Sequence, residues 1–102
     1  MENKKLAFIR QKLSKEELLC QLAEEASELA QAALKLRRVF DGTNPTPTTR
    51  KEAVRNFSEE ISDVALLVYL LGLDNHLARD NEVMNFKLNR WCDRLKERKN
   101  ET

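Results

Sequence analysis

Apolar and polar positions follow one another along most of this chain with the period of an α-helix. The longest such pattern covers residues 15–40, where apolar side chains recur at steps of three and four. They are Leu18, Leu22, Ala26, Leu29, Ala33, Leu36 and Phe40. Ser14 is the expected N-cap, with Glu17 as its capping-box partner. The spacing predicts a long helix that is buried along one side.

A second long helix is predicted over residues 50–71, after a loop at residues 41–49 that contains Gly42, Pro45 and Pro47. Thr49 and Glu52 form its expected capping box. Its apolar stripe is Val54, Phe57, Ile61, Val64, Val68 and Leu71. From Val64 onward this segment is apolar nearly all round, which is typical of a helix surrounded by other helices.

Shorter helices are predicted over residues 2–12 and 81–98, the latter with Asp80 as a candidate N-cap. The connector at 73–79 has room for one helical turn, and the tail after residue 98 is expected to fray. The last helix carries the stripe Met84, Leu88, Trp91 and Leu95, which we expect to be core. The predicted fold is all-α: a single domain over residues 1–102, built as an antiparallel helical bundle whose two long helices form an antiparallel pair.

Length and composition support this fold and add an expectation about assembly. The chain has 102 residues, of which 34% are charged and only two are Gly and two Pro. Such a composition favours long helices over sheets. A chain this short buries only about two thirds of its unfolded surface. We therefore expect a homo-oligomer whose second copy completes the core.

Charge and cysteine content narrow the functional classes. Lys plus Arg number 18 and Asp plus Glu number 17, so the net charge of +1 gives no overall attraction to nucleic acid. The longest apolar run, residues 64–71, is too short to span a membrane. Cys20 and Cys92 are isolated, which argues against zinc. Residues 1–10 are charged and lack the apolar run of a signal peptide, so we expect a cytoplasmic protein. We expect neither nucleic acid nor a membrane among its partners.

Two acidic segments stand out, Glu24 to Glu28 on the first long helix and Glu59 to Asp63 on the second. Each contains a carboxylate pair at i, i+3: Glu25 with Glu28, and Glu60 with Asp63. This spacing puts both side chains of a pair on one helix face, with Cβ atoms about 5–6 Å apart. In an antiparallel helix pair the two levels can face each other, so that four carboxylates surround one space.

Carboxylates gathered at the edge of an apolar core repel one another, and a proton or a cation must offset the repulsion. The donors are oxygens alone, since the sole histidine, His76, lies elsewhere. Oxygen ligands favour Mg²⁺, with Mn²⁺ as a possible substitute. Because Mg²⁺ commonly bridges to substrate phosphates, a phosphate substrate follows as a hypothesis. The alternative is a solvated acidic face, which needs no ligand.

At these residues the chain resembles the MazG-type all-α nucleoside triphosphate pyrophosphohydrolases. The similarity covers residues 18–71, with a weaker match to about residue 94, and rests on the order Glu-Glu-x-x-Glu followed by Glu-x-x-Asp. The resemblance implies a magnesium site on Glu25, Glu28, Glu60 and Asp63. It also implies hydrolysis of a nucleoside triphosphate between the α- and β-phosphates, giving the monophosphate and pyrophosphate, and a homodimer or homotetramer.

The resemblance also suggests roles for further residues. Glu24 matches the first acidic position of the pattern and, with Glu25 and Glu28, is a candidate catalytic residue that holds water or a second ion. Lys87, Arg90 and Arg94 form a basic face at steps of three and four and are assigned to phosphate contact, with a solvated basic face as the alternative. The gap between Glu28 and Glu60 is longer than in compact members of the family. The resemblance does not specify the base or the sugar of the substrate. The rival interpretation of the sequence is a non-catalytic helical interaction or regulatory module.

Overall fold

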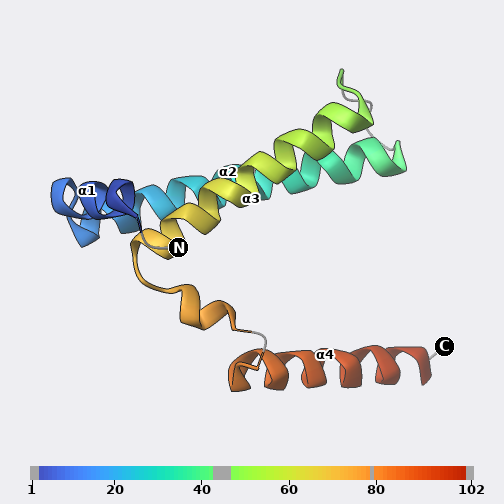
Figure 1. Ribbon diagram of the computed structural model, residues 1–102. Coiled ribbons are helices and arrows are strands. Elements are labelled where there is room, and N and C mark those ends of the chain that lie inside the picture. Colours follow the sequence, from blue (N-terminus) through green and yellow to red (C-terminus); the bar gives the residue numbers. More distant parts are fainter. Residues whose placement is uncertain (1–2, 43–46, 79, 101–102) are drawn as a thin grey trace. The chain divides into compact units, whose positions relative to one another are not determined.

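The computed structural model describes residues 3–42, 47–78 and 80–100, and these residues are almost entirely helical (Figure 1). The elements are α1 (Lys4–Lys12), α2 (Lys15–Asp41), α3 (Arg50–Leu70), the short 3₁₀ helix η1 (Asp74–Leu77) and α4 (Glu82–Asn100). The described residues contain no strand, so the predicted all-α class is confirmed. Each predicted helix is present, and the one-turn connector is η1. Part of the predicted loop, residues 43–46, lies outside the described residues.

The first turns of α2 and α3 are capped as the sequence predicts. The Ser14 hydroxyl accepts a hydrogen bond from the Glu17 amide at 3.1 Å, and the Thr49 hydroxyl accepts one from the Glu52 amide at 3.1 Å. These side chains satisfy backbone donors that have no partner within the helix. The two N-caps therefore fix where the long helices begin.

The predicted N-cap of α4 is wrong by one residue. The side chain of Asn81, and not that of Asp80, accepts hydrogen bonds from the amides of Val83 at 2.9 Å and Met84 at 3.2 Å. Asn81 stands immediately before the first helical residue, the position from which a short polar side chain reaches the second and third amides. At its other end α4 continues to Asn100, beyond the predicted end at residue 98.

The chain divides into two compact units, Met1–Gly72 and Leu73–Thr102. In the first unit α2 and α3 lie side by side and run in opposite directions, as predicted for the pair (Figure 1). Arg10 of α1 docks on the end of α3: its guanidinium donates to the carbonyl oxygens of Leu70 at 3.0 Å and Tyr69 at 2.6 Å. A cationic donor at a helix C-terminus satisfies carbonyls that have no partner within the helix. The wider bundle and its completion by a second copy stay predictions.

The apolar core of this hairpin is small and divided between its two ends. Near α1, a cluster of Leu6, Leu18, Leu67 and Leu70 is packed against Ile9, Leu22 and Leu71. Toward the other end the buried residues are alanines, Ala32 of α2 and Ala53 of α3. Small side chains let two helices approach closely, so the middle of the hairpin lies between an apolar cluster and a close helix–helix contact.

The predicted apolar stripes are only partly the buried ones. Along α2 the less exposed positions include Leu18, Leu22, Glu25, Leu29, Ala32 and Leu36, at alternating steps of four and three. The predicted members Ala26 and Ala33 are exposed, as are Phe40 (53%) and, on α3, Val54 (41%) and Ile61 (46%). The steps are those of two helices packed along a seam, and a glutamate occupies one of the seam positions.

The second unit leaves its apolar residues uncovered. Within this unit taken by itself, every member of the predicted α4 stripe is exposed, with Trp91 at 65%, and the expectation that Trp91 is core stays a prediction. The free thiols of Cys20 and Cys92 are exposed as well. Among the helices that the structure describes, none has the length and apolar character needed to cross a membrane.

Candidate metal centre

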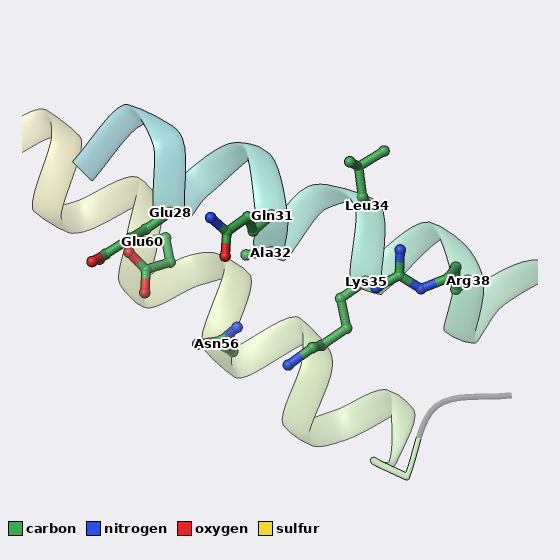
Figure 2. A pocket seen from close by; sticks show the side chains of 8 residues that line it. All are labelled: Glu28, Gln31, Ala32, Leu34, Lys35, Arg38, Asn56 and Glu60. Carbon is green, nitrogen blue, oxygen red and sulfur yellow. The ribbon is translucent and has the colours of Figure 1, made fainter. Parts of the chain in front are cut away.

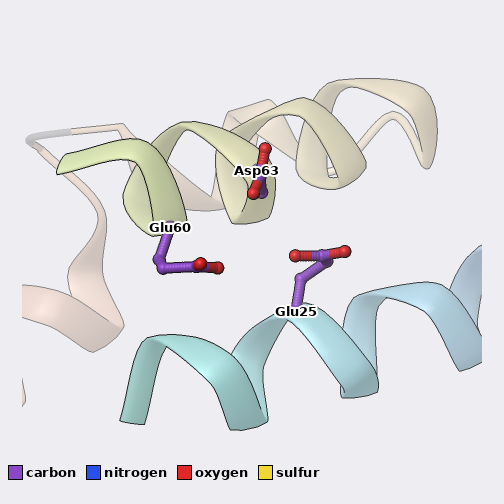
Figure 3. A group of neighbouring side chains, drawn as sticks. All are labelled: Glu25, Glu60 and Asp63. Atoms are coloured by element: carbon purple, nitrogen blue, oxygen red, sulfur yellow. The ribbon is translucent and has the colours of Figure 1, made fainter. Parts of the chain in front are cut away.

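Three carboxylates converge in the middle of the α2–α3 hairpin (Figure 3). Glu25 extends from α2 into the space between the helices, Glu60 extends from α3 into the same space, and Asp63 lies beside them one turn further along α3. One oxygen atom from each of the three lies within 4.8 Å of the others. The antiparallel pairing thus brings together three of the four carboxylates that the two i, i+3 patterns predicted, and Glu28 is not in this group.

The surroundings of Glu25 and Glu60 leave negative oxygen atoms without partners. Both side chains are half-buried, whereas Asp63 is exposed. Oε1 of Glu25 accepts a hydrogen bond from Nε2 of Gln21 at 2.9 Å. Oε2 of Glu25 and Oε2 of Glu60 are buried with no hydrogen-bond partner in the described part of the chain. Because ionised carboxylates are acceptors only, these two oxygen atoms require a hydrogen-bond donor, a proton or a cation.

Glu28 belongs to the same electrostatic group although its side chain is exposed. The negative charge of Glu25, and then that of Glu60, raises the pKa of Glu28 above its ordinary value of 4.5. Desolvation and hydrogen bonds with Glu25 and Glu60 act in the same direction. A protonated Glu28 can donate a hydrogen bond to either neighbour. In the absence of a bound cation, this proton partly compensates the excess negative charge.

The donor set suits a hard divalent cation. All four groups supply carboxylate oxygen, and in the described chain no histidine or cysteine joins the cluster. Mg²⁺ and Mn²⁺ prefer such oxygen ligands, whereas zinc and iron sites in proteins usually include nitrogen or sulfur. Three or four carboxylates also leave coordination positions free for water and substrate oxygen atoms. The residues present therefore fit the predicted magnesium site.

The other predicted site residues are Glu24 of the first unit and three basic residues of the second. Glu24 is exposed and is not among the three carboxylates that converge. Lys87, Arg90 and Arg94 are exposed on α4, which belongs to the second unit. The Arg90 guanidinium lies 5.6 Å from the centre of the Phe86 ring, on its own helix. Their assignment to phosphate contact stays a prediction.

A pocket of about 340 Å³ opens beside the carboxylates on the same hairpin (Figure 2). Its lining comprises Glu28, Gln31, Ala32, Leu34, Lys35, Arg38, Asn56 and Glu60. None of the residues beyond the two glutamates was predicted from the sequence. The signal was nevertheless there: Gln31, Lys35 and Arg38 follow Glu28 at steps of three, four and three, which is one polar face of α2.

Comparison of the chain with protein-family models, with curated proteins and with solved structures finds no match. The site itself offers converging carboxylates, two buried oxygen atoms without hydrogen-bond partners among the described residues, and an adjoining pocket lined by residues of both charges.

Proposed function

We propose that this chain is a Mg²⁺-dependent nucleoside triphosphate pyrophosphohydrolase of the MazG type. The observation that carries the proposal is the convergence of Glu25, Glu60 and Asp63, since one oxygen atom from each lies within 4.8 Å of the others. Oε2 of Glu25 and Oε2 of Glu60 are also buried with no hydrogen-bond partner among the described residues. Glu28 completes the set of four ligands. Mn²⁺ is expected to substitute for Mg²⁺, since both prefer oxygen donors.

In this proposal the carboxylates divide the chemical work. Bound Mg²⁺ would neutralise charge on the phosphate oxygen atoms and orient them for in-line attack. Glu25, Glu28, Glu60 and Asp63 would hold the ion, and Glu28 would also hold the attacking water and accept its proton. Water adds to the α-phosphorus, the bond to the bridging oxygen breaks, and pyrophosphate leaves. Glu24 is proposed to position water.

A panel of ribo- and deoxyribonucleoside triphosphates tests the activity directly. With Mg²⁺ or Mn²⁺ present, we expect at least one substrate to yield its monophosphate and pyrophosphate in equal amounts, without orthophosphate. Glu60→Gln should lose this activity, whereas Glu59→Gln, which changes an exposed neighbour, should keep it. Triphosphates that stay intact with both ions, or that release orthophosphate, would refute the proposal.

The rival function, a non-catalytic helical interaction module, is favoured by one observation. Among the described residues, fifteen large apolar side chains are at least 40% exposed. Thermal melting with and without Mg²⁺ separates the two functions. A bound ion at 100 times its dissociation constant stabilises the fold by about 2.7 kcal/mol, so an enzyme with this site melts at a higher temperature in the presence of the ion. An interaction module without the site does not.

A further inference from the structure

Two cations lie in the wall of the pocket that adjoins the carboxylates. Lys35 and Arg38 follow Glu28 on the same face of α2, roughly 10 and 15 Å further along the helix axis. In Figure 2 the Lys35 side chain extends from α2 toward the α3 side of the pocket, and the Arg38 guanidinium points back along α2 toward Lys35. The pocket therefore has an acidic end and a basic end.

Neither cation has a carboxylate partner within the described part of the chain. Both side chains are half-buried, although Lys and Arg are usually exposed unless they are paired. Arg37, which lies between them in sequence, behaves in the ordinary way: its side chain is 78% exposed and its Nε lies 3.5 Å from Oδ2 of Asp41. Partly buried cations that line a pocket are suited to bind an anion that enters it.

The polarity of the pocket restricts what that anion is. One end must accommodate a divalent cation held by carboxylates, and the other must neutralise negative charge. Between them lie the amide side chains of Gln31 and Asn56, which can accept and donate hydrogen bonds. A polyphosphate fits this order, because its first phosphate can share the metal while its terminal phosphates reach the cations.

We propose that Lys35 and Arg38 bind the β- and γ-phosphates of the triphosphate, and hence the pyrophosphate that leaves. This inference rests on the proposed function and assigns the leaving group to α2 of the hairpin. The nucleoside then lies on the opposite side of the metal, away from the pocket. Charge neutralisation at the departing oxygen lowers the cost of breaking its bond to the α-phosphorus.

The test uses Lys35→Gln, Arg38→Gln and the double variant, with Arg37→Gln as the matched control. Arg37→Gln removes the same charge from the same turn of α2, but from an exposed side chain outside the pocket. Binding of inorganic pyrophosphate in the presence of Mg²⁺ is measured by calorimetry, and KM is measured with the best triphosphate of the panel. Manganese binding without phosphate is measured in parallel.

Each pocket substitution should weaken pyrophosphate binding and raise KM about tenfold or more, which is the effect expected for a charge-assisted hydrogen bond. Arg37→Gln should stay within twofold of the unsubstituted chain, and manganese affinity should not fall in any variant. An active enzyme whose pyrophosphate affinity is unchanged in the double variant would overturn this inference and leave the proposed function intact.

The two proposals also separate in the opposite case. If no triphosphate is cleaved but Mg²⁺–pyrophosphate binds and the double variant loses that binding, the anion pocket stands and the catalytic function fails. If the unsubstituted chain does not bind pyrophosphate with Mg²⁺, the inference is wrong whatever the activity. If charge reversal of Arg90 abolishes pyrophosphate binding and the pocket substitutions do not, the leaving pyrophosphate is bound by α4 and not by the pocket.

Discussion

Glu25 and Glu60 are placed where an apolar residue would stabilise the hairpin better. Each lies at a half-buried position between α2 and α3, and each has an oxygen atom without a hydrogen-bond partner in the described chain. Two unit charges at such a separation repel by roughly 3 kcal/mol at an effective dielectric constant near 20. Residues that lower the stability of the fold at one site are often those retained for binding or catalysis.

Replacing Glu60 by Gln should therefore raise the stability of the metal-free protein. Solvent screens part of this repulsion because Glu60 is only half-buried. Its relief is therefore worth on the order of 1 kcal/mol, or an increase of about 4–8 °C in melting temperature for a unit of this size. The same variant should lose most of the rise that Mn²⁺ produces. Glu59→Gln, at an exposed position, is the control and should change neither quantity. A metal-free Glu60→Gln protein that melts at a lower temperature would indicate a structural carboxylate.

The raised pKa of Glu28 makes a prediction about pH. The folded state holds the Glu28 proton more tightly than the unfolded state does, because Glu25 and Glu60 repel the ionised form. This contribution to stability is fully present below the ordinary value of 4.5 and is lost as pH rises through the raised pKa. In metal-free protein the free energy of unfolding should fall over that range, and Glu28→Gln should remove this part of the slope. Urea denaturation at a series of pH values measures it.

Binding of Mn²⁺ should show the complementary trend. The ion competes with the Glu28 proton, so its affinity should increase as pH rises through the same pKa and then level off. Equal slopes of unfolding free energy for the unsubstituted chain and Glu28→Gln would contradict the coupling between these carboxylates.

At the scale of elements, helix boundaries follow from capping side chains that can be recognised in the sequence. One boundary depends on a single side chain: Asn81 accepts from the amides of Val83 and Met84. Asn81→Ala should cost the first turn of α4 about 1 kcal/mol, and amide exchange at these two residues should accelerate roughly fivefold. Asp80→Ala is the control, since Asp80 makes no such bond. An equal loss of amide-exchange protection in both variants would contradict the assignment of Asn81 as the N-cap.

The helices and their caps at Ser14 and Thr49 could be predicted because each depends on short sequence spacings. The convergence of carboxylates also depends on the antiparallel pairing, and three of the four predicted residues come together. The buried faces could be predicted only in part. A search for apolar residues at helical spacing selects Ala26 and Ile61, whereas the structure buries their neighbours Glu25 and Glu60 more deeply. The residues that give the site its chemistry are therefore the ones that the pattern treats as flanking.

The pocket was missed for a related reason. A polar face such as that of Gln31, Lys35 and Arg38 looks like a solvated surface until the helix that faces it is known. Only the pairing with α3, which brings Asn56 and Glu60 opposite, turns this face into the wall of a cavity. Local spacing predicts which residues share a face, but the partner helix decides whether that face is buried.

At the scale of the whole molecule, the described chain buries few large apolar side chains and exposes many. Its buried core consists of Leu6, Leu18, Ala32, Ala53, Leu67 and Leu70. Monomeric proteins rarely leave wide apolar surfaces in water, and a helix pair that is apolar on its outer side usually packs against further helices. The outer side of α3 carries Val54 and Ile61, two turns apart, at 41% and 46% exposure.

We therefore expect the chain to assemble, with a solution mass that is two or four times its own 11.9 kDa at micromolar concentration. Ile61→Lys should shift the equilibrium toward monomer, because burying an isoleucine contributes about 1.5–3 kcal/mol and a buried lysine without a partner costs more. Glu59→Lys places the same charged group on the opposite side of α3 and should leave the mass unchanged. Analytical ultracentrifugation measures both. A chain that sediments as a monomer at tens of micromolar would show that its exposed apolar residues serve a different partner.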